Sequence, residues 1–161
     1  LYTTCDMNAS LFVYSIDEKL ATKISDDLKV TAANWSPKDD WIAISALAAD
    51  GTNDLYLIST RAQGIKRLTD TPGVNESFPV FTKDGKYLAF ISNRYGDTNE
   101  IEYLDLEKNT FQRPLIRGMY PTLSPTNKWV AFEIGPEVGI SRSDGLNAKV
   151  LVLGRTPFWI N

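Results

Sequence analysis

Carboxylates are the side chains of this sequence best suited to chemistry, because the chain has no histidine and a single cysteine. The absence of histidine excludes a Ser-His-Asp triad and a Cys-His pair, and it removes the commonest zinc and iron ligand. Two carboxylates about 5–10 Å apart could still carry out hydrolysis. Such a pair could come from Asp50, Asp70, Glu76 and Asp97, so an enzyme that processes carbohydrate or peptide is one alternative.

Binding is the main interpretation of the most polar loop that contains an aromatic residue, Asn93–Asn99. Arg94 and Tyr95 are residue types enriched at interface hot spots, so they are candidate anchors for a partner. In the structural alternative, Asn93 and Asp97 bond to the backbone of the turn and Arg94 pairs with a neighbouring carboxylate.

Asn75 and Glu76 lie just before a strand and add to this candidate surface. Their oxygens could instead bind Ca²⁺, together with Asp50, Asp70 or Asp97, but no EF-hand-like run supports such a site. We therefore predict no cofactor, no metal ligand and no catalytic residue. The predicted binding residues are Asn75, Glu76, Asn93, Arg94, Tyr95 and Asp97.

The composition excludes several classes of protein. A net charge of −3, without a block of Lys or Arg, argues against nucleic-acid binding. No run of 18 apolar residues is present, so no membrane-spanning segment is predicted. Because the chain starts at Leu1, we expect that an upstream segment such as a signal peptide has been removed. Cys5 is expected to be a buried or half-buried strand residue, with a lipid-modified cysteine as the alternative.

Residues 74–106 contain the pattern around which the chain is organised. Asp84-Gly85 between two apolar runs predicts a hairpin turn. Tyr87–Ser92 is apolar on both faces, which is typical of a strand with other sheets packed on both sides. With Glu100–Leu106 and Phe111–Leu115, the unit has four short strands joined by tight turns.

The same order of strands and turns appears before and after this unit. Pro37, Lys83 and Pro125 occupy one repeat position, with spacings of 46 and 42 residues. A period in the forties with four strands per repeat is typical of β-propeller blades. The hydrophobic residues at one position of the first strand are expected to pack between blades; they are Trp35, Phe81, Leu123 and Trp159.

The predicted fold is therefore all-β, a propeller of four blades with four antiparallel strands each. Blade 2 covers residues 28–70, blade 3 covers 71–116 and blade 4 covers 117–155. Blade 1 would combine 1–27 with 156–161, whose strand would close the ring and leave no open sheet edge. The rival interpretation is a portion of a larger ring.

Two kinds of connection, from strand two to three and from strand four to the next blade, gather at one end of such a ring. This end surrounds the mouth of the axial channel, and loops on a rigid scaffold commonly carry function. The predicted rim segments are Asp6–Ser10, Ala46–Asn53, Asp70–Glu76, Asn93–Asn99, Gly118–Tyr120 and Gly135–Gly139.

The stretch Phe78–Arg94, preceded by Arg67–Gly73, resembles the repeats of TolB-type β-propellers, and Asn34–Asp39 and Thr122–Pro125 are further copies. The resemblance implies a periplasmic protein that acts by docking partners. TolB has six blades and an additional N-terminal domain, which do not fit into 161 residues, so partner identity is not carried over. The chain looks more like a short, stand-alone bacterial member. Peptidase propellers share such blades, but their triad lies in a separate hydrolase domain.

We therefore predict a non-catalytic protein-binding or assembly module of the bacterial cell envelope. It would be periplasmic or otherwise extracytoplasmic, with membrane anchoring through a lipid as an option. Its rim loops would bind a protein partner in the envelope or in a membrane complex. The alternatives are a structural subunit of a larger membrane-associated complex, and the carboxylate enzyme.

Overall fold

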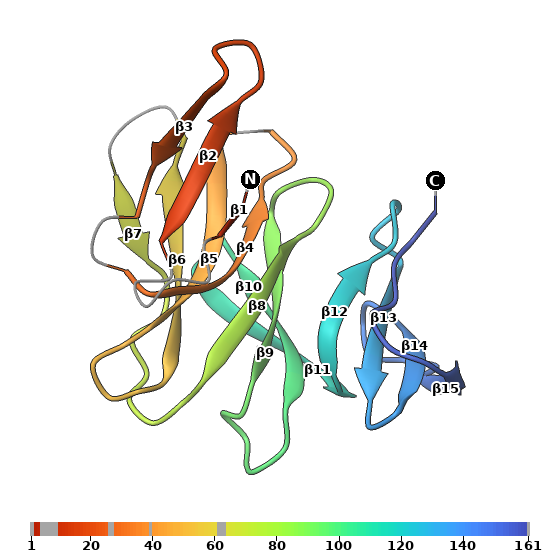
Figure 1. Cartoon of the computed structure of the whole chain (residues 1–161). Helices are drawn as coiled ribbons and strands as arrows, with labels where there is room; N and C mark the ends of the chain where they lie inside the picture. Colours follow the sequence, from red (N-terminus) through yellow and green to blue (C-terminus); the bar gives the residue numbers. More distant parts are fainter. Residues whose placement is uncertain (1, 4–9, 26–27, 39, 61–63, 161) are drawn as a thin grey trace.

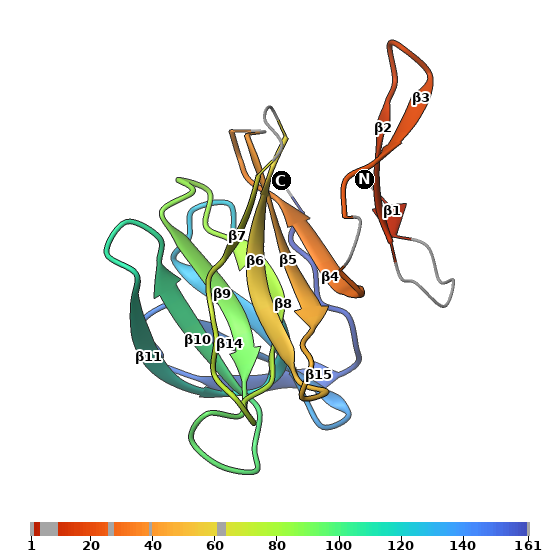
Figure 2. The ribbon, with the colours of Figure 1, turned by 90° about the vertical axis from the view of Figure 1, so that its left-hand side faces the viewer.

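The computed structural model describes residues 2–3, 10–25, 28–38, 40–60 and 64–160. Within these ranges the regular elements are β-strands, arranged as four antiparallel sheets that follow one another in chain order (Figures 1 and 2). Cys5, most of the predicted rim segment at residues 6–10, and residue 161 lie outside the described residues. In the described part of the chain no helix has the length and apolar character needed to cross a membrane.

Each sheet is a meander in which every strand pairs with its neighbours in the sequence. The first sheet has three strands, β1 (Tyr2–Thr3), β2 (Leu11–Ser15) and β3 (Leu20–Lys23). The second has β4 (Val30–Trp35), β5 (Trp41–Leu47), β6 (Asn53–Ser59) and β7 (Ile65–Arg67). The third has β8 (Glu76–Phe81), β9 (Tyr87–Ser92), β10 (Glu100–Asp105) and β11 (Thr110–Arg117). The fourth has β12 (Met119–Leu123), β13 (Trp129–Ile134), β14 (Glu137–Arg142) and β15 (Lys149–Leu153).

Three apolar cores lie between successive sheets, as expected for strands that are apolar on both faces. The core between the second and third sheets combines Leu55, Phe81 and Phe90, and the core between the third and fourth combines Ile101 with Phe132. The central strand β9 is buried between these two cores. Phe81 is 7% exposed, which confirms the predicted packing between blades at its repeat position.

The predicted Asp84-Gly85 turn is present and is held by side-chain hydrogen bonds. Gly85 has a φ of 70°, the left-handed conformation that glycine adopts without steric cost. The Asp84 carboxylate accepts hydrogen bonds from the Thr82 hydroxyl at 2.6 Å and from the Lys86 backbone N–H at 3.1 Å. In the fourth sheet Asn127, with a φ of 57°, takes the same repeat position.

The first strands of the third and fourth sheets are interrupted at equivalent places. Phe78 and Tyr120 have φ values of 53° and 50°, and the strand register shifts around each of them. Each is followed by a proline, which has no N–H to donate to the ladder. Such bulges bend a strand and redirect its side chains. Thr156, with a φ of 49° before Pro157, repeats this local conformation.

The closing strand predicted at residues 156–161 is not formed, since residues 156–160 have no strand conformation. The Thr156 N–H donates to Glu133 Oε1 at 2.5 Å, and the Trp159 indole N–H donates to the Thr122 carbonyl at 3.0 Å. These bonds hold the segment against the fourth sheet, away from β1 (Figure 1). The first sheet therefore keeps three strands in the described residues.

The predicted rim loop at Gly135–Gly139 is also wrong. Ile134 pairs directly with Glu137, so the connection between β13 and β14 is a tight turn, with Gly135 at a φ of 61°. The sequence Gly-Pro favours this short turn, and β14 begins at Glu137, within the predicted rim segment. The fourth sheet therefore contributes a short turn, and no extended loop, to the rim between β13 and β14.

Candidate functional site

Asparagine side chains join the rim ends of the second and third sheets. The side-chain oxygen of Asn75 accepts hydrogen bonds from the Asn53 backbone N–H at 3.0 Å and from the Asn53 amide at 2.9 Å. The Asn75 N–H in turn donates to the Asn93 side chain at 2.8 Å. Two of the predicted binding residues, Asn75 and Asn93, thus connect the backbones of neighbouring loops.

Arg94 lies inside the protein, between two buried glutamates. Its guanidinium contacts Glu76 Oε1 at 2.5 Å and Glu102 Oε2 at 3.6 Å, and it stacks 4.2 Å from the Phe111 ring centroid. Both glutamate side chains are fully buried, and only 20% of the Arg94 side chain is exposed. Arg94 therefore pairs with a carboxylate, as the structural alternative foresaw, and its charge faces away from solvent.

Burial has a marked effect on the acidity of Glu76. Removal of the carboxylate from water raises the pKa of Glu76 to about 7, although the positive charge of Arg94 acts in the opposite direction. The ion pair between Glu76 of β8 and Arg94 of the β9–β10 loop therefore changes its charge near neutral pH. The pair connects the start of β8 to the loop after β9, and the Arg94 guanidinium is the cation that faces the buried Glu76 carboxyl.

Tyr95 and Asp97 are the members of the predicted set that face solvent. They lie in the loop between β9 and β10, where Tyr95 is 47% exposed. The N–H of Gly96 donates to the Asn93 carbonyl at 3.2 Å and closes the turn that presents Tyr95. The structure therefore brings together Asn75, Glu76, Asn93 and Arg94, and it leaves Tyr95 and Asp97 on the outer surface of the rim.

The other carboxylates considered for hydrolysis serve local structure. Asp50 accepts hydrogen bonds from Thr52 and from the Gly73 N–H, and these lower the pKa of Asp50 to about 2. Asp70 pairs with Arg67 at 2.9 Å, and Arg67 also pairs with the buried Asp54. Within the described residues no group of three or more His, Cys, Asp or Glu is placed to hold a metal ion.

A pair of aromatic side chains is exposed where the first strands of the sheets approach one another. Phe78 and Tyr120 make an edge-to-face contact, with ring centroids 4.6 Å apart and planes at 83°. They are 36% and 37% exposed and line a cavity of about 270 Å³ with residues of β4, β8 and β12. We call Phe78 and Tyr120 the aromatic pair.

Sequence reasoning overlooked the aromatic pair, although a signal was present. Phe78-Pro79 and Tyr120-Pro121 are both aromatic–proline dipeptides at one repeat position. A bulge with φ above zero in a bulky residue is an outlier that often marks a functional surface. The pattern of apolar residues does not reveal the positive φ values of Phe78 and Tyr120 or the contact between their rings.

Known proteins resemble the chain in sequence and in fold. A protein named as a Tricorn-like protease C-terminal subunit, from Sulfurisphaera tokodaii, is 28% identical over 122 residues, 73% of this chain and 14% of that protein. The Tol-Pal system protein TolB of Helicobacter pylori is 30% identical over 86 residues, 53% of this chain and 20% of TolB. The structure of TolB from Acinetobacter baumannii matches with a TM-score of 0.74 at 17% identity, over 88% of this chain and 37% of that one.

These comparisons define the class of the fold, a β-propeller repeat protein. The similarity to TolB-type propellers, expected from the repeats, is confirmed by sequence and by structure. No protein-family model matches the chain. The chain spans only 14–20% of the curated relatives it matches.

Proposed function

We propose that the chain is a protein-binding module whose contact surface is centred on the aromatic pair, with Tyr95 on the adjoining rim. The observation that carries this proposal is the exposure of Phe78 and Tyr120 on strained backbone beside a cavity. Aromatic residues supply large contact area at low entropic cost and dominate interface hot spots. Their position on inner strands provides a pre-formed surface, which reduces the cost of ordering on binding.

Binding explains this surface better than catalysis does. Asp50, Asp70 and Glu76 are each engaged in local hydrogen bonds or ion pairs. A glycosidase pair would need one free carboxylate and one free carboxylic acid on either side of a bound substrate. Among the described residues, no Asp, Glu, Lys or Arg lines the cavity beside the aromatic pair, which offers shape and apolar area for recognition.

The cell envelope is the proposed place of action, through the likeness to TolB of the Tol-Pal system. In this proposal the partner is an envelope protein that inserts an apolar side chain or an extended segment against Phe78 and Tyr120. The amide and ion-pair contacts below the rim, Asn75–Asn93 and Glu76–Arg94, hold the surrounding loops in one conformation. Membrane anchoring and a structural role in a larger complex are further options within the same class.

Site-specific photo-crosslinking tests the proposal. A benzophenone amino acid is placed at position 78, at position 120 or, as a control, at Tyr14, which is 46% exposed on the first sheet. After irradiation with the envelope fraction of the source cells, we expect the same discrete protein adduct from positions 78 and 120 and none from position 14. Equal labelling at all three positions, or adducts from position 14 alone, would contradict the proposed surface.

A further inference from the structure

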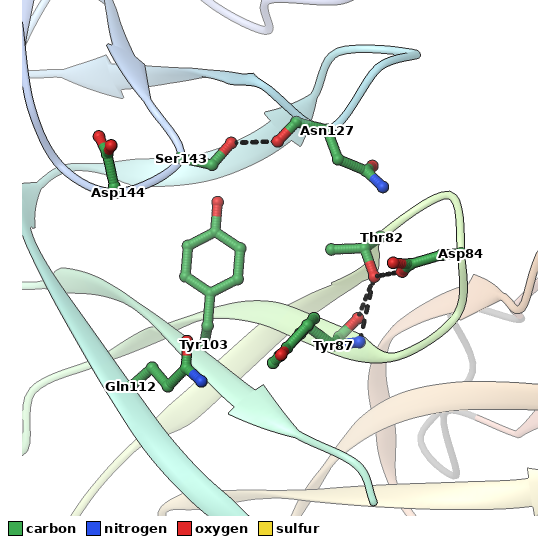
Figure 3. Close-up of a pocket in the computed structure, with 8 residues that line it drawn as sticks. All are labelled: Thr82, Asp84, Tyr87, Tyr103, Gln112, Asn127, Ser143 and Asp144. Carbon is green, nitrogen blue, oxygen red and sulfur yellow. Dashed lines mark hydrogen bonds between the residues drawn. The ribbon is translucent and has the colours of Figure 1, made fainter.

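A second cavity lies between the third and fourth sheets, at the end of the molecule opposite the rim. It has a volume of about 510 Å³, and residues from β9, β10, β11 and three turns line it (Figure 3). The turns that contain Asp84, Asn127 and Ser143 connect first to second or third to fourth strands, so they lie at the far end from the rim loops. This cavity is therefore independent of the aromatic pair and of the proposed function.

The Tyr103 hydroxyl is buried in this cavity and has no hydrogen-bond partner among the described residues. Tyr103 is 6% exposed, and its ring projects from β10 beside Gln112, its cross-strand neighbour on β11. The hydroxyl points toward the Ser143 side chain across the cavity (Figure 3). Buried hydroxyls are normally paired, so an orphaned one that faces a cavity marks a place for a ligand atom.

The protonation state of Tyr103 makes it a donor. Burial raises the pKa of Tyr103 to about 12, with the nearby Ser143 hydroxyl acting in the opposite direction. At neutral pH the phenol therefore keeps its proton. The group can donate one hydrogen bond to a ligand oxygen and accept another.

The rest of the cavity wall offers both hydrogen-bond acceptors and hydrogen-bond donors. The Asp84 carboxylate accepts hydrogen bonds from Thr82 and Lys86. The Asp144 carboxylate contacts Arg142 and accepts from the Leu146 N–H. Each carboxylate keeps further lone pairs for a ligand. Ser143 donates to the Asn127 carbonyl at 2.6 Å, which leaves its oxygen as an acceptor. The Asn127 side-chain oxygen accepts from the Lys83 N–H at 2.8 Å, so its NH₂ group is the part left to donate.

The charge of the wall restricts the ligand. Two carboxylates line the cavity, and among the described residues no Lys or Arg does. An anionic ligand would be repelled, and an apolar one would leave the carboxylates, amides and phenol without partners. Ligand hydroxyls both donate and accept, which matches this mixed wall, and Tyr103 and Tyr87 add aromatic surface for a ring.

We propose that the cavity between the third and fourth sheets binds a neutral hydroxylated ligand, a mono- or disaccharide unit, with one of its hydroxyls bonded to Tyr103. The volume lies within the range of small-ligand sites, about 300–1,000 Å³. In the bound state the Tyr103 hydroxyl acquires a hydrogen-bond partner of good geometry, which the described residues do not provide. Gln112, Asn127 and the two aspartates orient the remaining hydroxyls.

The test is a titration of the whole chain by calorimetry and saturation-transfer NMR. The probes are glucose, galactose, N-acetylglucosamine, maltose and cellobiose, with glucuronate as the anionic counterpart. We expect at least one neutral sugar to bind, and glucuronate to bind more than about tenfold more weakly than glucose if glucose is that ligand. Absence of binding by all five neutral sugars, or glucuronate binding as well as they do, would overturn the proposal.

The Tyr103→Phe variant separates a binding role from a structural one. We expect it to weaken sugar binding about tenfold, the equivalent of one hydrogen bond. Its melting temperature should stay equal to that of the wild type or rise, because the variant removes a buried hydroxyl that makes no well-formed hydrogen bond to the described residues. Tyr95→Phe, on the opposite end of the molecule, is the matched control and should bind as the wild type does. Unchanged binding, or a clearly lower melting temperature, for Tyr103→Phe would refute the assignment.

Discussion

Replacement of Arg94 by methionine tests whether this residue stabilises the rim from within. Methionine keeps most of the apolar stem and removes the charge, so Glu76 and Glu102 lose the cation between them. Both carboxylates are fully buried, and removal of one partner of such a pair costs about 3–5 kcal/mol. The lost stacking of the guanidinium on Phe111 adds about 1 kcal/mol. This loss is a large part of a typical unfolding free energy of about 5–15 kcal/mol.

Urea unfolding followed by tryptophan fluorescence measures the loss, at pH 8 and at pH 5. At pH 5 the Glu76 carboxyl is protonated, since its pKa is about 7, so the variant should lose less stability than at pH 8. Tyr95→Ala, the exposed neighbour in the sequence, is the control and should change the unfolding free energy by less than about 0.5 kcal/mol. A cost below about 1 kcal/mol for Arg94→Met at pH 8, or an equal cost at both pH values, would refute the reasoning.

Two further predictions concern stability. Because the folded state raises the pKa of Glu76 from 4.5 to about 7, it binds the proton more tightly than the unfolded state does, and stability should fall as pH rises through this window, by about 3 kcal/mol. Glu76→Gln should flatten that slope in chemical unfolding at a series of pH values, and an unchanged slope would contradict it. Gly139→Ala should cost about 1–3 kcal/mol, because a Cβ at this position would lie 2.6 Å from the Phe132 ring. Gly154→Ala, whose Cβ would meet Val138 at 3.6 Å, should cost less in the same assay, and equal costs would be the contrary result.

The repeat made the sheets predictable from the sequence. Alternating turn and strand signals, such as Asp84-Gly85 before Tyr87–Ser92, depend on local conformation and on two-sided burial. Both are properties of residues close together in the chain. The structure accordingly has the expected turn and the expected buried strand β9.

Contacts between sheets were harder to predict. The segment at residues 156–160 resembles the start of another repeat, and Thr156 has the backbone conformation of Tyr120. Its hydrogen bonds to Glu133 and Thr122 nevertheless place it on the fourth sheet, and pairing with β1 would require them to break. No local pattern determines which of two distant edges such a segment meets.

The candidate site likewise combines features that depend on local sequence with features that depend on contacts between strands and sheets. Asn75, Glu76, Asn93 and Arg94 were recognised as a polar group near one end of the fold, but whether Arg94 faced solvent depended on the depth of Glu102 in β10. Tyr103 was overlooked because it belongs to an ordinary apolar strand pattern. The cavity that Tyr103 faces is formed partly by turns of the fourth sheet, so the environment of its hydroxyl depends on contacts between sheets.

The most direct test of the proposed function is the affinity between this chain and the protein captured by photo-crosslinking at position 78. Biolayer interferometry would compare the wild type, the double variant Phe78→Ala/Tyr120→Ala and the control Tyr14→Ala, each checked for folding by circular dichroism. Two hot-spot residues at about 2 kcal/mol each predict that the double variant binds about 1,000-fold more weakly, with the control within about twofold of the wild type. Wild-type affinity in the folded double variant, with a loss in Tyr14→Ala, would contradict the assignment of binding to the aromatic pair.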